Sequence, residues 1–233
     1  MEIINKVKNV PHMKRLITIV ISVVMTAGVF AQDMFFPSRE GLSLLYANID
    51  AKGKINNYTR LTIKKVEGSG SNFSISYVGQ VLDKNNNPAN DIEIPYTVTV
   101  VNGVVEWDMK SFAAPGTEAF IEIEGDKIRI PSSLAPGDKL DDVRFTMTLN
   151  MGIRIRTEIS LTEQQCLAIE DVTVPAGTFR CHKLTQTSSA TVMRRTSITK
   201  TVSWYAAGIG TVKSETYDDK NKLQSSTVLH AIE

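Results

Sequence analysis

The chain has 233 residues, with 26 Lys or Arg and 25 Asp or Glu, so its net charge is close to zero. No run of like charge stands out, which argues against nucleic acid or an anionic membrane surface as the main partner. Two cysteines and three histidines leave little material for a metal site, and none is expected.

The first 31 residues read as an export signal. Met13-Lys14-Arg15 is a short positive segment, residues 16–30 are an apolar run, and Val29-Phe30-Ala31 places small residues where a signal peptidase cuts. The alternative is a retained anchor, but the run is shorter than the roughly 20 residues needed to span a bilayer. We expect cleavage after Ala31 and a periplasmic or secreted protein. No cysteine lies near the cleavage point, so amino-terminal lipidation is not expected.

Residues 32–233 predict a single all-β domain. Almost every segment alternates apolar and polar side chains, the period-2 pattern of a half-buried strand. Helix signal is confined to one turn at residues 109–113. Roughly a dozen strands joined by short turns make a long antiparallel meander. Such a sheet closes into a barrel or curls into a half-barrel, or clam, over a core.

The first strands are expected at residues 42–50, 58–66 and 73–81, each followed by a Gly-, Asn- or Asp-rich turn. The next strand ends at Asn102-Gly103, the strongest two-residue hairpin signal because both positions accept positive φ. This turn would set Val100 opposite Val105 and Val98 opposite Trp107. A single apolar face results, as a half-buried sheet requires.

Gly125-Asp126 suits a type II′ turn and predicts a second hairpin. It would place Ile123 against Ile128 and Ile121 against Ile130. On the other face, two ion pairs would form across the strands, Glu124 with Lys127 and Glu122 with Arg129.

A third hairpin follows residues 131–142, which are too rich in Pro, Gly and Ser for a strand. Its strands share one parity, so an odd-numbered loop is needed. Asn150-Met151-Gly152 supplies it and would set Met147 opposite Ile155.

Residues 174–179 form the sharpest turn. Pro175 fixes φ at the first corner, and Gly177 permits the left-handed second corner of a type II turn. Cys166 and Cys181 flank this turn, and in an exported protein such a pair favours a disulfide. A tight hairpin, however, would set Cys181 opposite about Asp171, so a bulge would be needed. Two small buried side chains are the alternative.

The last strands are expected at residues 198–204, 212–217 and 223–232. A set of aromatic residues alternates along these and the earlier strands and either fills a core or lines an apolar cavity. The set is Phe73, Tyr77, Tyr96, Trp107, Phe145 and Trp204.

No catalytic set is recognisable. There is no Gly-x-Ser-x-Gly nucleophile elbow and no phosphate-binding glycine pattern before a helix. Cys181 and His182 are adjacent on a strand, so their side chains point to opposite faces and cannot form a catalytic pair. We expect neither an enzyme nor a cofactor.

Three stretches, Val172–Lys183, Trp204–Glu215 and Leu134–Asp142, resemble the TapB-like family of exported β-rich bacterial proteins of unknown function, mostly from Bacteroidetes-type bacteria. The resemblance covers roughly residues 40–230. It implies a shape similar to the curled-sheet clam of lipoprotein carriers. These motifs specify turns and core aromatics, so no catalytic residue is carried over.

The leading hypothesis is therefore an exported, non-enzymatic binding module. Its curled sheet would hold a lipid or another apolar small molecule, or a lipidated or other envelope protein. One alternative is a structural or assembly protein of the envelope that works through its surface or sheet edge. The weakest is a hydrolase, which would need His182 or His230 beside a Ser, Cys or carboxylate in a cleft.

Overall fold

The computed structural model describes residues 34–112, 120–150 and 153–233, so the expected signal peptide at residues 1–31 lies outside it. The described residues build one antiparallel sheet of 13 strands and one short 3-10 helix, η1. The elements are β1 (Ser43–Asp50), β2 (Ile55–Ser69), β3 (Asn72–Leu82), β4 (Pro88–Val101), β5 (Val104–Trp107), η1 (Met109–Phe112), β6 (Ile121–Gly125), β7 (Ile128–Pro131), β8 (Val143–Asn150), β9 (Arg154–Val174), β10 (Gly177–Val192), β11 (Arg195–Ala206), β12 (Gly210–Asp218) and β13 (Leu223–Ile232).

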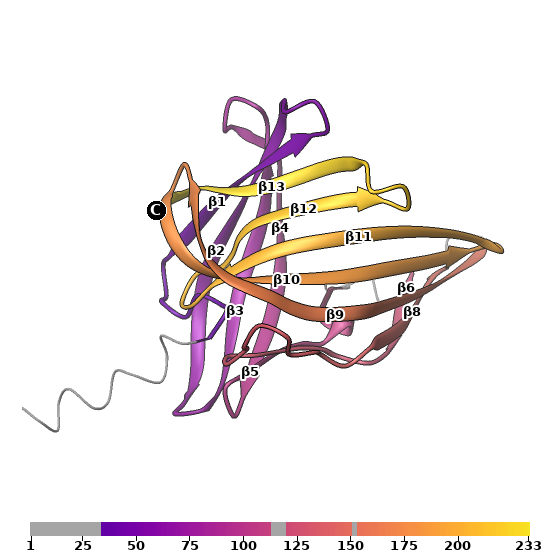
Figure 1. Ribbon diagram of the computed structural model, residues 1–233, viewed down its shortest axis with the longest axis horizontal. Helices are drawn as coiled ribbons and strands as arrows, with labels where there is room; N and C mark the ends of the chain where they lie inside the picture. Colours follow the sequence, from indigo (N-terminus) through magenta and orange to yellow (C-terminus); the bar gives the residue numbers. More distant parts are fainter. Residues whose placement is uncertain (1–33, 113–119, 151–152) are drawn as a thin grey trace, which may run out of the picture.

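The sheet is a meander whose first and last strands also pair. Strands β8 to β13 lie side by side in chain order, and so do β1 to β5. Strand β13 joins the two runs by pairing with β1, where Leu229 lies opposite Tyr46. Figure 1 shows the long strands β9–β11 running crosswise to β2–β5, so the sheet is strongly curled. The expected curled antiparallel meander is confirmed.

The two edges of the sheet are consecutive in the chain. Strand β6 is one edge and β7 the other, and only Asp126 and Lys127 separate them. Because two residues cannot span a flat sheet of this width, the edges must approach each other at this point. The chain thus draws the meander into a nearly closed curl.

The hairpin predicted at Gly125-Asp126 is wrong. Strand β6 pairs with β8, so Ile123 lies opposite Met147 rather than Ile128. Strand β7 pairs with β5, and Lys127 and Arg129 both form ion pairs with a carboxylate of that strand instead of with β6. Lys127 and Arg129 could have paired with the acidic residues of β6 or with Glu106 of β5. The pairing with Glu106, which is more distant in the sequence, is the one that forms.

The other two predicted hairpins form. At Asn102-Gly103, φ is 52° and 78°, and Val100 lies opposite Val105. The third hairpin joins β8 to β9, but its register differs by two residues from the prediction. Met147 lies opposite Thr157, and Ile155 opposite Leu149. Because the shift is even, the apolar face is preserved.

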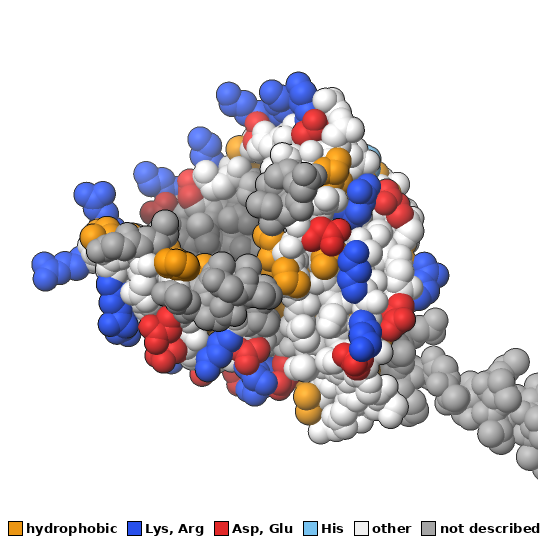
Figure 2. Space-filling view, turned by 180° about the vertical axis from the view of Figure 1, so that it is seen from behind, with side chains coloured by type: hydrophobic (Ala, Val, Ile, Leu, Met, Phe, Trp, Pro, Cys, Tyr) orange, Lys and Arg blue, Asp and Glu red, His pale blue; other side chains and the backbone are white. Residues whose placement is uncertain are grey.

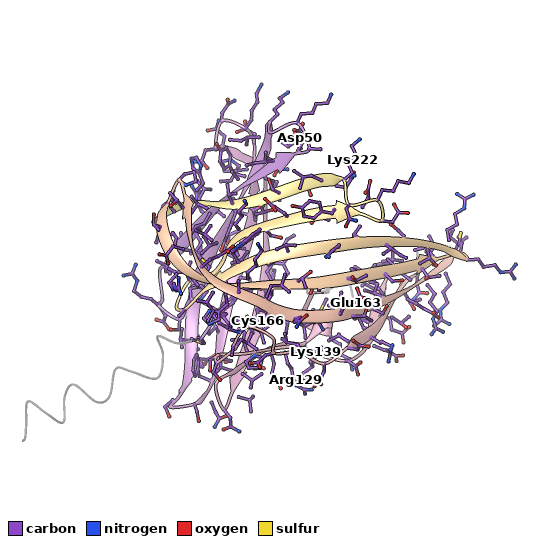
Figure 3. The ribbon with its side chains drawn as sticks, viewed as in Figure 1. Asp50, Arg129, Lys139, Glu163, Cys166 and Lys222 are labelled. Atoms are coloured by element: carbon purple, nitrogen blue, oxygen red, sulfur yellow. The ribbon has the colours of Figure 1, made fainter. Side chains whose placement is uncertain are left out.

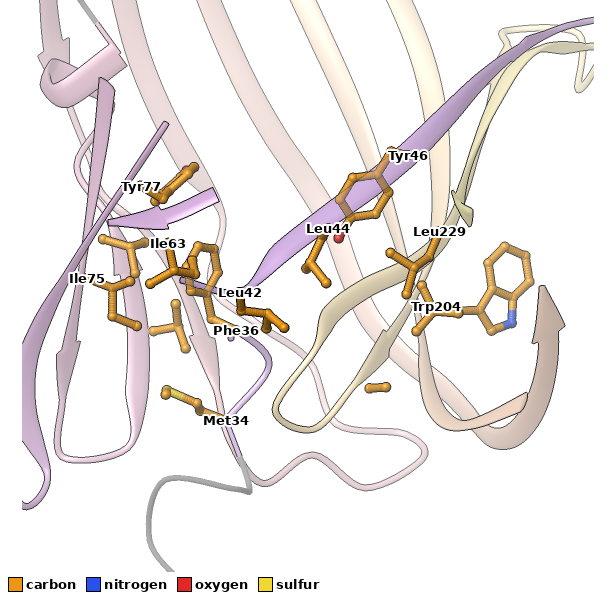
Figure 4. Packing of buried hydrophobic residues seen from close by; sticks show 14 of the residues in the cluster. Met34, Phe36, Leu42, Leu44, Tyr46, Ile63, Ile75, Tyr77, Trp204 and Leu229 are labelled. Carbon is orange, nitrogen blue, oxygen red and sulfur yellow. The ribbon is translucent and has the colours of Figure 1, made fainter. Parts of the chain in front are cut away.

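The amino-terminal residues of the described chain are part of the core. Met34 and Phe35 are 2% and 1% exposed, and Phe36 packs against Tyr77 and Trp107 with ring centroids 5.2 Å and 6.0 Å apart. Figure 4 shows Met34 and Phe36 among the side chains of β1–β3. Met34 is the third residue after the predicted signal cleavage site.

The β9–β10 turn is tighter than expected. Val174 pairs with Gly177, so Pro175 and Ala176 are the two turn residues. Gly177, with φ 137°, begins the returning strand and is not the second corner of a type II turn.

The predicted disulfide is not formed. Cys166 lies opposite Leu184 and packs with Phe35, whereas Cys181 lies opposite Glu170 and packs with Trp204. The two buried thiols are free and belong to different clusters of the core. The alternative of two small buried side chains is the one that the structure adopts. Figure 3 labels Cys166 at the curled end of β9.

Candidate functional site

A cleft of about 300 Å³ lies on the concave side of the sheet. Figure 2 shows a hollow on this side of the molecule, with hydrophobic side chains at its rim. Strands β5, β7 and β9–β12, with the loop before β8, supply the lining. The residues are Trp107, Ile128, Ile130, Leu140, Leu161, Gln164, Leu184, Thr185, Gln186, Thr201, Ser203, Tyr205 and Thr211.

One wall of the cleft is apolar and centres on Trp107 at the end of β5. Phe36 packs edge-on against the Trp107 ring, with ring centroids 6.0 Å apart, and also against Tyr77 at 5.2 Å. Burial raises the pKa of Tyr77 to about 12, so its hydroxyl stays neutral over the physiological range. Trp107 is thus packed against aromatic rings, and Ile128 and Ile130 of β7 extend the same wall.

A smaller cavity of about 180 Å³ adjoins the cleft. The two share Trp107, Tyr205 and Thr211 in their linings. Burial raises the pKa of Tyr205, so its hydroxyl stays neutral. Tyr46 donates to the carbonyl of Thr211 at 3.0 Å. Uncharged side chains therefore form the partition between the cavities.

The other wall of the cleft is polar and uncharged. Side chains opposite one another in an antiparallel ladder share a face, and Ser203 lies opposite Leu184 on β10 and Ser214 on β12. The row continues through Thr227 to Asn48. The four polar members are bonded in two pairs: Ser203 donates to Ser214 at 3.3 Å, and Thr227 donates to Asn48 at 3.0 Å. We call these four polar residues the inner row.

A second row lies two residues further from the core on each strand. Gln186 lies opposite Thr201, Thr201 opposite Thr216, and Thr216 opposite Ser225. We call these four residues the outer row. The side chains of Gln186, Thr201 and Thr216 form no hydrogen bond with any other residue that the structure describes. They are half-buried, so their donors and acceptors are available on the concave face.

None of the described residues that line the cleft is charged. This decides which chemistry fits. Hydrocarbon covering an unpaired hydroxyl or amide costs about 1–3 kcal/mol for each group left without a partner. A buried ion without a counter-ion costs several kcal/mol. The apolar wall therefore accepts hydrocarbon, whereas the outer row accepts neither hydrocarbon nor an ion without loss.

The aromatic residues proposed from the sequence as a cavity lining are dispersed. Trp107 lines the cleft and Tyr77 the adjoining cavity. Phe145 lines a separate depression of about 420 Å³ with charged neighbours. Tyr96 stacks on Tyr77 with ring centroids 5.2 Å apart, and Phe73 packs against the core.

Trp204 lies on the other side of β11 from Tyr205, because neighbouring strand residues point to opposite faces. Its indole donates to Glu170 at 2.7 Å, and the ammonium groups of Lys183 and Lys213 lie 5.1 Å and 4.9 Å from its ring centroid. Figure 4 shows it beside Leu229 and away from the amino-terminal residues. It is not among the residues that line the cleft.

Sequence reasoning missed the polar wall, although a signal was present. Residues 197–203 carry a hydroxyl at every second position, and residues 214–216 and 225–227 repeat the spacing. Alternating hydroxyls indicate a polar strand face in the same way that alternating apolar residues indicate a buried one.

The two described histidines give the hydrolase alternative no support. His182 packs against Phe35 with ring centroids 4.8 Å apart, and burial lowers its pKa. His230 packs against Tyr58 at 5.2 Å. Within the described ranges, neither bonds to a Ser, a Cys or a carboxylate. In the same ranges, no helix is long and apolar enough to cross a membrane.

Comparison with known proteins places these features in a wider group. The model of the DUF3108-like family matches residues 39–229. A candidate exported protein with a YmcC-like fold from Bacteroides fragilis is 25% identical, with a TM-score of 0.69 over 86% of this chain and 99% of its own. A candidate lipoprotein from Parabacteroides distasonis is 23% identical, with a TM-score of 0.70 over 86% of this chain and 98% of its own. No curated protein is similar enough to match.

Proposed function

The chain belongs to the DUF3108-like family, and we propose that it is an exported, non-enzymatic binding module whose concave cleft holds the apolar part of a ligand. The observation that carries this proposal is the uncharged cleft of about 300 Å³ with Trp107, packed against Phe36, in its wall. Ligand sites are concave and mostly apolar, with a few polar groups that set orientation, and volumes begin near 300 Å³.

The ligand class follows from the apolar side chains that line the cleft. Trp107, Ile128 and Leu161 line the cleft, and burying apolar surface there stabilises a complex by about 25 cal/mol for each Å² removed from water. A short alkyl or acyl chain meets these requirements, whether free or attached to an envelope protein. The proposal therefore keeps both a lipid and a lipidated partner.

The sheet edges favour binding in the cleft over assembly through an edge. Strand β7 offers four residues as a free edge. Lys127, Arg129 and Lys139 surround the depression beside it, and Figure 3 shows Arg129 and Lys139 on this side of the molecule. Short strands and basic side chains are devices that discourage edge-to-edge pairing. The assembly alternative therefore lacks a suitable edge at β7.

Export completes the proposal. The expected signal peptide ending at Ala31, and a Bacteroides neighbour that is a candidate exported protein, support a periplasmic or secreted location. The finer TapB-like assignment, from Val172–Lys183 and Trp204–Glu215, belongs to the same proposal. Because another neighbour is a candidate lipoprotein, intact mass of the exported protein is informative. We expect a chain that begins at Gln32 without added lipid, and a diacylglyceryl mass would contradict this.

Native mass spectrometry of protein purified from its own envelope tests the binding role. We expect a co-purifying apolar molecule or lipidated protein, and we expect Leu140→Trp to remove it by filling the cleft. Leu167→Trp is the matched control, because Leu167 is 44% exposed and does not line the cleft. Identical loads in wild type and Leu140→Trp would refute the cleft as the site.

A further inference from the structure

We infer that the ligand carries an uncharged, hydroxyl-bearing head group, of the glycosyl kind, which lies along the outer row of the polar wall. The inference rests on the proposed function, because the apolar part of the same ligand occupies the cleft. It adds the chemical class of the part that projects from the cleft.

Along β10, the side chains that face the cleft change from apolar to polar. On β10, Leu184 is buried and faces the cleft, and Gln186 follows it two residues further out on the same face. On β11, Ser203 is bonded to a neighbour whereas Thr201 is not. Beyond Leu184 and Ser203, the next side chains on the same face of the two strands are polar and have no partner among the described residues. A ligand that extends past this point changes from hydrocarbon to hydrogen-bonding atoms.

The outer row offers several hydrogen-bonding groups of different kinds. Gln186 supplies an amide with donors and an acceptor, and Thr201 and Thr216 supply hydroxyls that donate and accept. Their spacing follows the sheet, with neighbouring strands about 4.8 Å apart. Several mixed donors and acceptors at this spacing match the hydroxyls of a sugar ring. A single carbonyl or amine would leave most of them without a partner.

The same lining disfavours charged heads. Phosphate, sulfate and carboxylate heads need Arg, Lys or backbone N–H groups directed at them. No described residue of the cleft lining is charged, and the nearest row members are Ser, Thr, Gln and Asn. Lys213 and Lys183 flank Trp204 on the other face of β11 and cannot serve. An anionic lipid head is therefore disfavoured in favour of a neutral one.

Amphiphiles with identical tails separate the head from the tail. Isothermal titration calorimetry of the wild type uses dodecyl maltoside, dodecyl sulfate and dodecylphosphocholine, each below its micelle concentration, with maltose alone as a fourth probe. We expect the maltoside to bind at least about ten-fold more tightly than the anionic dodecyl sulfate and the zwitterionic dodecylphosphocholine, a difference near 1.4 kcal/mol. Equal affinities for all three would overturn the head-group inference and leave the proposed function intact.

Two variants locate the effect. Thr201→Val keeps the side-chain shape and removes the hydroxyl, and we expect it to reduce the maltoside preference about three-fold or more without changing dodecyl sulfate binding. Thr178→Val, at the exposed tip of the β9–β10 hairpin, is the control and should change neither. If maltose alone binds as tightly as the maltoside, the head-group inference holds and the apolar proposal fails. If no dodecyl amphiphile binds, both fail.

Discussion

Glu106 is the side chain that holds the returning edge of the sheet in place. Its carboxylate accepts from Arg129 at 2.7 Å and from Lys127 at 3.2 Å, and only 13% of its side chain is exposed. Lys127 immediately precedes β7, and Arg129 is its second residue. The pair of bonds explains why these cations do not reach Glu122 and Glu124 as the sequence pattern suggested.

Replacing this carboxylate gives a pH-dependent loss of stability. The guanidinium of Arg129 is the main cause that lowers the pKa of Glu106 in the folded protein. A lowered folded pKa means that the stabilisation is present above the unfolded pKa, about 4.3, and is lost as the pH falls through the folded value. We expect Glu106→Gln to lower the free energy of unfolding by about 1 kcal/mol at neutral pH. Urea titrations should show this difference disappearing well below the unfolded pKa.

Glu122→Gln is the matched control for this experiment. Glu122 pairs with Arg154 at 3.6 Å, but the two side chains are 47% and 71% exposed. Such exposed pairs contribute little, often within about 0.5 kcal/mol. A Glu106→Gln deficit that is the same in acid and at neutral pH would show that packing, not the ion pair, is responsible.

The cysteines give a second prediction at this scale. Burial raises the pKa of Cys181 to about 11 and also raises that of Cys166. The thiolate is the reactive form, so both should react slowly with iodoacetamide while the protein is folded. Intact mass after unfolding without reductant should show two added carbamidomethyl groups. A protein that takes up none until it is reduced would instead contain the disulfide.

Strands were easier to predict from the sequence than their partners. The hairpin at Asn102-Gly103 could be read because both turn residues and the flanking pattern are local. The β6–β7 connection could not, because Gly125-Asp126 fits a type II′ turn equally well. Only the pairing of β7 with β5, at the other edge of the curled sheet, excludes the hairpin. The cleft shares this difficulty, because strands far apart in the chain build its walls.

Gly125 allows the chain to pass from β6, at one edge of the sheet, to β7 at the other. Its φ is 133°, and a Cβ added there would meet the carbonyl oxygen of Arg144 and would lie 2.5 Å from Cα of Phe145. Asp126 then keeps the chain on β8, since its N–H donates to the carbonyl of Arg144 at 2.8 Å. A side chain at position 125 would therefore push the chain away from β8 just before it crosses.

We expect Gly125→Ala to destabilise the protein by more than about 3 kcal/mol, the strain of an unfavourable φ plus a backbone clash. Gly53→Ala is the control for φ strain alone, because Gly53 has φ 81° and its added Cβ meets nothing within 4 Å. That variant should lose about 1–2 kcal/mol, the cost of the left-handed conformation for a residue with a Cβ. Thermal or urea unfolding measures both. Similar losses in the two variants would mean that β6 can move away from β8 without penalty.

At the scale of the whole molecule, the curl is closed by packing at one end. Met34, Phe35 and Phe36 enter the core between the two runs of strands. Phe35 contacts the cluster of Cys166 and Leu184, whereas Phe36 joins the cluster of Tyr77. The first residues after the predicted signal cleavage site thus connect the two clusters. Periodicity could not show this, because the segment precedes the first strand.

Phe35→Ala tests whether the whole curl depends on this segment. Phe35 is 1% exposed, and deleting a buried phenyl ring costs about 3–5 kcal/mol when the cavity cannot collapse. Phe120→Ala removes the same atoms from a side chain that is 55% exposed, and its effect should stay within about 0.5 kcal/mol. Urea unfolding followed by circular dichroism compares the two. Because Phe35 packs on His182 and Tyr205 of one run while the adjacent Phe36 packs on Tyr77 of the other, we expect one cooperative transition at lower urea for Phe35→Ala. Two separate transitions would show that the runs unfold independently, and the amino-terminal segment would then stabilise only one of them.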